Sequence, residues 1–348
     1  MDKPVILTGL RSNNDLHIGN YFGALLPLIE MAKNNSGKYQ INLFVPDLHS
    51  FTTPVDHPGL YKQTLHNLRL YVAAGLPIDD TNIHIYRQSA IPAHSELTWI
   101  LDCFTSYSMM QRMTQFKDKS KNLIDEQANS SEITVGLFNY PVLMASDMLL
   151  YGAQYIPVGD DQTQHIEYAR DIAERLNSKF GDLFVLPKPV SEQHKFFGRE
   201  QGLRIKDLVN PIKKMSKSTE SDKGVLFLGD SPQSAKAKVM AATTDSYGRI
   251  NLDADNQPGI TNLLQILSLL KNESMEDVAN EWVGKTSYGD LKTAVGDMIA
   301  DFLVKLQDNM SKVDENSIIN RLETDEKLMN LQANETLYKV QRAVGLRP

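Results

Sequence analysis

The stretch that decides the fold reads Val5-Ile-Leu-Thr-Gly-Leu-Arg-Ser-Asn-Asn-Asp-Leu-His-Ile-Gly-Asn20. Its opening residues are apolar or β-branched and end at Gly9, a pattern that is typical of a short buried strand. A polar, turn-rich loop follows, and the apolar spacing predicts a helix from Ile18 to Met31. Because backbone N–H groups and the helix dipole favour negative charge at a helix start, this junction suits a phosphate group.

Two residues at this junction are candidates for chemistry. Gly19 has no Cβ, so a flat ring could approach the backbone closely there. His17 could donate to a phosphate on which charge accumulates in a transition state. An ordinary helix start with a histidine beside it accounts for the same residues, so the junction alone leaves both interpretations open.

The rest of the chain divides into two parts that differ in their pattern of strand and helix signals. Further strands are expected at Ile41–Val45 and Asn82–Tyr86, with a helix from His57 to Ala74 between them. This alternation predicts a parallel α/β sheet of Rossmann type, with its ligand at the C-terminal ends of the strands. Beyond about residue 222 strand signals nearly vanish, apart from 224–228, and helices are expected at 231–242, 260–270, 275–282, 287–307 and 318–344.

We therefore expect two domains, since a domain typically has about 100–200 residues. The first is a Rossmann-type catalytic domain over residues 1–220, rejoined by a C-terminal helix at 335–348. The second is an all-helical domain over residues 221–334.

Composition narrows the class of protein. The 348 residues carry a net charge of −7, and 41% of them are hydrophobic, which excludes wholesale disorder. A single cysteine, Cys103, excludes a disulfide framework and a thiolate zinc cluster. The sequence contains neither a signal-peptide pattern nor an apolar run long enough to span a membrane, so we expect a cytoplasmic protein.

Two groups of cations stand out against the acidic total. The segment Lys213-Lys-Met-Ser-Lys-Ser218 could neutralise a leaving pyrophosphate from a mobile loop. A second group could contact RNA, although a solvated loop explains either group equally well. Its members are Arg112, Lys117, Lys119 and Lys121.

A third signal lies in a strongly apolar stretch. Tyr140, Met144 and Asp147 are spaced i, i+4 and i+7, which places them on one face of a helix. A buried carboxylate needs a donor, and an indole N–H can only donate. Met144 offers a polarizable thioether to an aromatic ring. The alternative is that Asp147 pairs within the protein while the other two residues belong to the core.

Together the two loop motifs resemble the paired signatures of a known enzyme family. His17-Ile-Gly-Asn20 and Lys214-Met-Ser-Lys-Ser218 resemble the signatures of class I aminoacyl-tRNA synthetases, although Asn20 stands where the family has histidine. The segments 112–120, 136–177, 202–205 and 258–264 are similar to bacterial-type tryptophanyl-tRNA synthetases almost residue by residue. The resemblance runs from Val5 to Leu346.

This resemblance implies a tryptophan–tRNA ligase that uses ATP with Mg²⁺, charges tRNA(Trp) and forms a homodimer. His17, Lys214 and Lys217 would be catalytic, the strip of cations would approach the acceptor arm, and the helical domain would read the anticodon. Leu7, His49 and Gln162 would join Tyr140, Met144 and Asp147 around L-tryptophan. ATP would contact Arg11, Ser12, Asn13, Gly19, Asn20, Gly159, Asp160, Asp161, Ile205, Lys214, Met215, Ser216, Lys217 and Ser218.

Three alternatives remain at this point. A tyrosyl enzyme would place a glutamine where Met144 stands, and a small adenylyltransferase would lack the helical half. A catalytically silent tRNA-binding or tryptophan-binding paralogue predicts eroded signatures. Local departures from the family pattern occur at Arg11–Asn14, Lys206 and Asn210. They leave the resemblance intact but weaken the transfer of roles to those positions.

Overall fold

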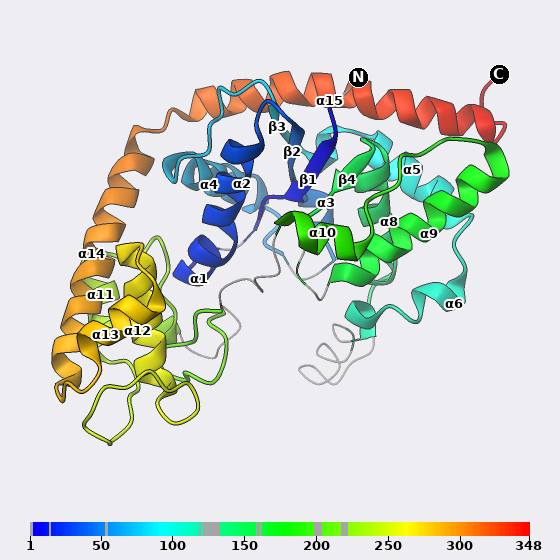
Figure 1. The fold of residues 1–348 in the computed structure, drawn as a ribbon. Helices are drawn as coiled ribbons and strands as arrows, with labels where there is room; N and C mark the ends of the chain where they lie inside the picture. Colours follow the sequence, from blue (N-terminus) through cyan, green and yellow to red (C-terminus); the bar gives the residue numbers. More distant parts are fainter. Residues whose placement is uncertain are drawn as a thin grey trace.

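A computed structural model gives the fold. It describes residues 3–13, 15–52, 55–117, 120, 133–157, 159, 162–197, 204–216 and 222–348. Four parallel strands form one sheet in the order β3-β2-β1-β4 (Figure 1). Their bounds are Val5–Gly9 for β1, Gln40–Val45 for β2, Ile83–Arg87 for β3 and Ala153–Tyr155 for β4. The three strands expected from the sequence are therefore confirmed, and so is the Rossmann-type class.

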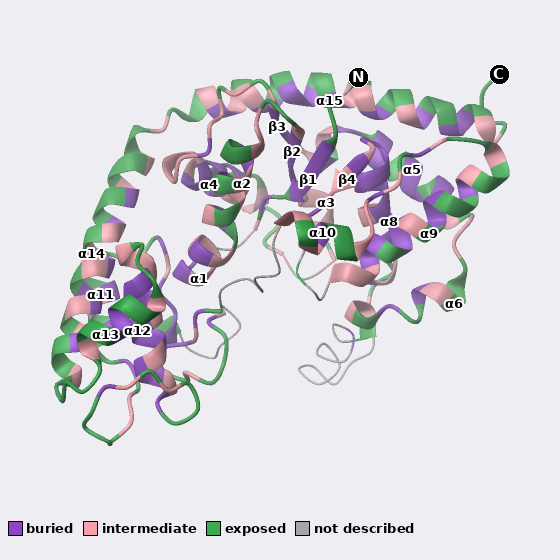
Figure 2. Cartoon of the chain, viewed as in Figure 1, coloured by how far each residue is buried: buried purple, intermediate pink, exposed green. Residues whose placement is uncertain are grey.

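Alternation along β2 explains why both faces of the sheet are covered. Ile41, Leu43 and Val45 belong to a hydrophobic cluster that includes residues of α2 (Leu26–Asn35) and α4 (Leu60–Ala73). Phe44 belongs to a second cluster, which includes residues of α5 (Ala93–Asp102), α8 (Val135–Leu149) and α9 (Thr163–Phe180). Side chains of a strand point alternately to the two faces, so each face has its own core. Figure 2 shows that the strands of the sheet consist largely of buried residues.

The helix expected at 18–31 is a composite. A short turn, α1 (Ile18–Asn20), passes into a π-helical turn at Tyr21–Leu25 and then into α2. Proline at the second position of α2 has no N–H to donate, and it follows the π-helical turn directly, where the regular pattern of backbone bonds is already changed. Short helices α3 (Asp47–Ser50), α6 (Tyr107–Met110) and α10 (Val190–Phe197) lie around the sheet.

The second half is helical, as expected. It contains α11 (Pro232–Met240), α12 (Pro258–Lys271), α13 (Met275–Trp282), α14 (Tyr288–Lys312) and α15 (Glu315–Ala343). The strand signal at 224–228 produces no sheet strand. A 3₁₀ turn occupies Asp222–Gly224, and Phe227 forms a single antiparallel bridge with His17. The reason is that the partner segment lies directly before α1, which leaves only a few residues to pair.

The last helix, α15, returns across the α/β half and covers the edge strand β3 (Figure 1). Asp325 accepts a hydrogen bond from the backbone N–H of Ile85 at 2.7 Å and another from Arg321 Nε at 2.7 Å. Glu326 binds Arg87 through two bonds of 2.6 and 2.8 Å. Edge strands expose unpaired N–H groups, so these carboxylates complete the edge of the sheet.

These contacts bear on the boundaries expected from the sequence. The return to the α/β half begins well before residue 335, since Arg321 already donates to the carbonyl of Asp80 at 3.1 Å. The hydrophobic cluster around α2 and α4 also continues into α11, α12 and α14. The domain boundary expected at residue 220 therefore stays a prediction. Within the described residues, no helix combines the length and apolarity needed to cross a membrane.

Replacing Asp325 with alanine should destabilise the whole fold. The change leaves the N–H of Ile85 without its acceptor and Arg321 without its carboxylate partner, and breaking a buried ion pair costs about 3 kcal/mol. Urea unfolding of Asp325→Ala measures this loss. Glu323→Ala, on the exposed side of the same helix, is the matched control and should change the unfolding free energy little. Equal effects of the two changes would contradict the role given to the carboxylate.

Candidate active site

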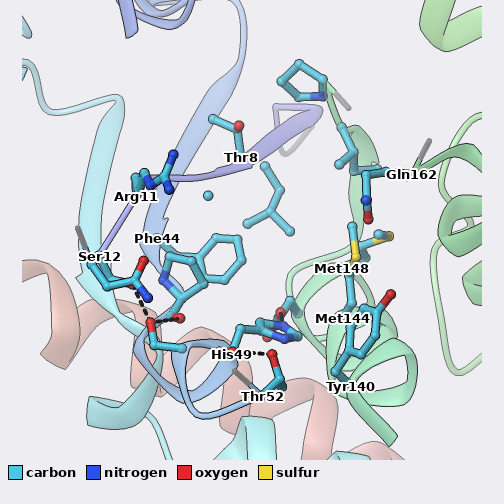
Figure 3. A pocket seen from close by; sticks show the side chains of 18 residues that line it. Thr8, Arg11, Ser12, Phe44, His49, Thr52, Tyr140, Met144, Met148 and Gln162 are labelled. Carbon is cyan, nitrogen blue, oxygen red and sulfur yellow. Dashed lines mark hydrogen bonds and ion pairs between the residues drawn. The ribbon is translucent and has the colours of Figure 1, made fainter. Parts of the chain in front are cut away.

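A cavity of about 490 Å³ opens at the C-terminal ends of β1 and β2. Sequence reasoning placed the ligand at this edge of a parallel sheet, and the size is that of a small-molecule site. Figure 3 shows Tyr140, Met144 and Met148 along the α8 side, with Phe44 and Arg11 across the space from them. The other lining residues are Leu7, Thr8, Gly9, Ser12, Asn13, Pro46, His49, Ser50, Thr52, Asp147, Ile156, Pro157 and Gln162.

Asp147 is the charged group of the α8 wall and is only 1% exposed. Its Oδ2 lies 2.9 Å from Nε2 of His49, and its Oδ1 lies 2.6 Å from Nδ1 of His94 and 2.7 Å from Nε2 of Gln88. Burial by itself raises the pKa of Asp147, but the hydrogen bonds and charges of the two histidines outweigh it and hold the pKa below its usual value. The carboxylate is therefore ionised at neutral pH and acts only as an acceptor.

Both sequence interpretations of Asp147 hold in part. The carboxylate pairs within the protein, as the structural alternative requires. It also lines the cavity, and a carboxylate can accept about four hydrogen bonds. Among the described residues, Oδ2 accepts from His49 alone. One acceptor position on this oxygen thus remains for a ligand.

Sequence reasoning missed two of the three partners of this carboxylate. Gln88 follows directly after β3, so the rule that ligands gather at strand ends could have found it. His94 lies in the first turn of α5 and is fully buried. No spacing or motif distinguishes it in the sequence, because the contact with Asp147 joins residues 53 positions apart.

His17 lies outside the wall of this cavity and is 5% exposed. Its pKa falls to about 4, because burial disfavours the charged ring and the cations Arg11 and Lys214 repel it. The ring is therefore neutral at pH 7, and Nδ1 has no hydrogen-bond partner among the described residues. A Cβ added at Gly19 would lie 3.0 Å from this ring, so a larger residue at this position would crowd His17.

Backbone hydrogen bonds hold the two sequence motifs near each other. The N–H of Ile18 donates to the carbonyl of Leu226 at 2.9 Å, and that of Leu228 donates to Leu16 at 2.9 Å. The lysine segment is anchored in turn by a bond of 3.0 Å from the N–H of Met215 to the carbonyl of Ile205. Lys214 lies close enough to His17 for its charge to lower the pKa of the ring.

The expected ATP residues are distributed unevenly around this centre. Arg11, Ser12 and Asn13 line the cavity, whereas Gly19 and Asn20 are not among its lining residues and lie in α1. The side chains of Ile205 and Met215 are buried in the core, so a nucleotide could reach only their backbone. Lys214 and Gly159 are exposed and Ser216 is half-buried. Asp160, Asp161, Lys217 and Ser218 lie outside the described residues, as do Lys119 and Lys121 of the basic strip.

Comparison with known proteins identifies this arrangement. The model of a family described as class I tRNA synthetases (W and Y) matches residues 2–304. A tryptophan–tRNA ligase of Caldanaerobacter subterraneus subsp. tengcongensis is 39% identical over 341 residues, which cover 98% of each chain. The chain belongs to the tryptophanyl branch of the class I tRNA synthetases.

Solved structures agree with this placement. The structure of tryptophanyl-tRNA synthetase from Mycoplasma pneumoniae matches with a TM-score of 0.79 and 32% identity, covering 99% of this chain and 98% of that one. The enzyme from Campylobacter jejuni, complexed with ADP and tryptophan, also has a TM-score of 0.79, at 27% identity and with coverage of 98% and 99%.

Two departures from the synthetase signatures have visible structural consequences. Asn20 stands where the family signature has histidine, and its Oδ1 accepts the backbone N–H of His17 at 3.2 Å. The amide therefore closes the first turn of α1. Arg11 is exposed at the cavity, and its backbone carbonyl accepts from Asn67 at 3.1 Å. In this synthetase, a positive charge thus faces the cavity from the loop after β1.

The stability of the fold should depend on pH through His17. The pKa of its ring is about 4 in the folded chain and 6.5 when unfolded, so the unfolded chain binds a proton first as the pH falls. Stability contributed by the neutral ring is complete above pH 6.5 and is lost towards pH 4, by up to about 3 kcal/mol.

Urea unfolding between pH 7 and pH 4 measures this loss. The decline should be shallower in His17→Asn than in the unmodified chain. His66→Asn, a change at an exposed histidine on α4, should leave the slope unaltered. Parallel declines in all three proteins would contradict the assignment.

Proposed function

We propose that this chain joins L-tryptophan to tRNA(Trp) in two steps. Tryptophan and ATP first form tryptophanyl-adenylate and pyrophosphate. The tryptophanyl group is then transferred to the 3′-terminal ribose of the tRNA, which releases AMP. The observation that carries the proposal is the ionised carboxylate of Asp147 on the wall of a mainly apolar cavity. An aromatic ring with one N–H donor fits such a surface.

The tryptophan pocket follows from the residues around this carboxylate. The indole N–H would donate to Oδ2 of Asp147, and Met144 would lie against the ring with its thioether. Leu7 and Tyr140 supply further apolar surface. His49 and Gln162 complete the candidate set on the same cavity.

ATP would occupy the polar side of the site. Arg11, Ser12 and Asn13 line it, and Gly19, which has no Cβ, would let the nucleotide approach the start of α1. The backbone around Ile205 and Met215, together with Gly159, Asn20, Lys214 and Ser216, would contribute further contacts. The family resemblance alone suggests the same for Asp160, Asp161, Lys217 and Ser218.

The chemistry of activation needs no protein nucleophile, because the carboxylate of tryptophan itself attacks the α-phosphorus. Catalysis then rests on positioning and on stabilising the charge that develops on the phosphates. The ring N–H of His17 can donate to a phosphate oxygen, and the ammonium groups of Lys214 and Lys217 oppose the charge of the departing pyrophosphate. A bound phosphate also favours protonation of His17, opposite to the effect of Arg11 and Lys214.

Mg²⁺ would be bound mainly by the phosphates of ATP. Within the described residues, no group of three or more His, Cys, Asp or Glu side chains could hold a metal ion. Phosphate oxygens and water are the usual ligands of Mg²⁺ in nucleotide sites, so this protein surface fits an ion delivered with the nucleotide. When bound, the ion neutralises phosphate charge.

The tRNA would contact both halves of the chain. Arg112 and Lys117 are exposed, and with Lys119 and Lys121 they form the candidate strip for the acceptor arm. The helical residues 221–334 would read the anticodon. Because ATP and tRNA meet in translation, we place the protein in the cytoplasm.

We also propose a homodimer through the α/β half. Trp99, Tyr107 and Val135 are 71%, 68% and 82% exposed, and they come from α5, α6 and the start of α8. Large apolar side chains exposed on neighbouring helices mark interaction surfaces. Light scattering should report a particle of about twice the 39.1 kDa chain, and a particle of single-chain mass would contradict a dimer.

ATP–pyrophosphate exchange with tryptophan, tyrosine or phenylalanine tests the reaction and its specificity. Tryptophan should support exchange best, and Asp147→Asn should weaken the use of tryptophan about 10- to 100-fold, which is the worth of a hydrogen bond to a charged group. Asp102→Asn is the matched control, because this half-buried carboxylate accepts from Asn139 at 2.9 Å away from the cavity.

Each other outcome of the exchange assay has a distinct meaning. A preference for tyrosine would leave the chemistry in place but overturn the assignment of the pocket. The absence of exchange in folded protein would favour a silent paralogue that binds tRNA or tryptophan.

The lysine segment offers a second test. Lys214→Ala should lower the kcat of exchange about 100-fold and leave the KM for tryptophan nearly unchanged, because the lost charge acts mainly in the transition state. Lys213→Ala is the control: this neighbour is also exposed, but only Lys214 contributes to the pKa shift of His17. Equal losses in the two variants would show that general charge, rather than position, matters.

A further inference from the structure

The carboxylate of Asp147 is hydrogen-bonded, on the side away from the cavity, to a histidine that has had no part in the proposed reaction so far. Nδ1 of His94 lies 2.6 Å from Oδ1 of Asp147, and Nε2 lies 2.9 Å from the hydroxyl of Tyr151. The ring of His94 is fully buried and does not line the cavity. It therefore cannot touch a ligand there, and any influence on the reaction passes through Asp147.

The direction of the hydrogen bonds follows from the chemistry of the partners. The ionised Asp147 only accepts, so Nδ1 of His94 carries the proton. Burial raises the pKa of Tyr151 well above its ordinary value, which keeps its hydroxyl protonated. This hydroxyl can accept a hydrogen bond from Nε2 or donate one to it, so both ring nitrogens have a partner. The ring of His94 is thus held between Asp147 and Tyr151.

Fixing His94 also fixes the carboxylate. Oδ1 receives two donors from behind, His94 and Gln88, which leaves Oδ2 as the oxygen with a position open to the cavity. Without the Nδ1 donor, burial would favour protonation of Asp147 and would remove one of the bonds that set its rotation. Either change weakens acceptance of a hydrogen bond from a ligand.

We propose that His94 is a positioning residue for substrate selection, which keeps Asp147 ionised and turned so that Oδ2 accepts the indole N–H. This inference rests on the proposed activation of tryptophan. It predicts that His94 controls the preference for tryptophan over an analogue of the same shape without the N–H. The benzothiophene analogue, in which sulfur replaces the ring N–H, is such a probe.

The test compares tryptophan with this analogue in ATP–pyrophosphate exchange. The ratio of the two kcat/KM values reports the N–H bond, because a site built for a donor rejects a substrate lacking it. His94→Gln places its amide nitrogen near the Nε2 position and removes the donor to Asp147. His94→Asn places its amide nitrogen near the Nδ1 position and keeps that donor.

His94→Gln should reduce the preference for tryptophan about 10-fold or more, chiefly by raising the KM for tryptophan. His94→Asn should retain most of the preference. Thr98→Val is the control for packing: Thr98 is buried one turn along α5 and bonds to Ser146 and to the carbonyl of His94 rather than to Asp147. This change should affect both substrates equally.

The outcomes separate the two proposals. If the unmodified chain shows no tryptophan-dependent exchange, both the proposed function and the role of His94 are wrong. If that exchange is present but His94→Gln keeps the full preference, or matches His94→Asn, only the role of His94 is overturned. If the His94 variants do not fold, Tyr151→Phe removes the partner of Nε2, and an unchanged preference in that variant would overturn the inference.

Discussion

The short antiparallel pairing of Leu16–Ile18 with Leu226–Leu228 is the constraint on which the active centre depends. It joins the loop after β1 to the start of the helical half through main-chain atoms. Asn262 of α12 then holds the backbone of Lys206 with bonds of 2.8 and 3.0 Å, beside the bridge between Lys206 and Lys214. Because main-chain bonds set these positions, His17 and the lysine segment are brought together whatever their side chains do.

A second constraint is the burial of charge at Asp147. Moving a carboxylate out of water costs several kcal/mol unless donors surround it, and here two histidines and Gln88 serve as donors. They come from α3, α5 and the turn after β3, so three elements must be in place before the charge is tolerated. Two of these donors have a further partner, since Nε2 of His94 lies 2.9 Å from the hydroxyl of Tyr151 and Oε1 of Gln88 accepts the N–H of His49 at 3.4 Å.

The sequence predicts the sheet well because its signals are local. Runs such as Ile41–Val45 and the apolar stripe of α8 reveal their period within a few residues. The helical period alone placed Tyr140, Met144 and Asp147 on one face of a helix, and the family resemblance assigned that face to tryptophan. The remaining features depend on contacts across the chain. The strand signal at 224–228 gave only a bridge because its partner segment is short, and His94 gained its place from a residue 53 positions away.

The carboxylates of α15 also bear on the order in which the protein can be completed during synthesis. The N–H of Ile85 finds its acceptor only in Asp325, which is synthesised 240 residues later. At a translation rate of about 5–20 residues per second, the edge of the sheet stays uncovered for roughly 12 to 48 seconds. Until the last helix leaves the ribosome, β3 offers its free edge to any other strand. The nascent chain therefore passes through a long interval in which the edge of its sheet is open to pairing with a neighbouring chain.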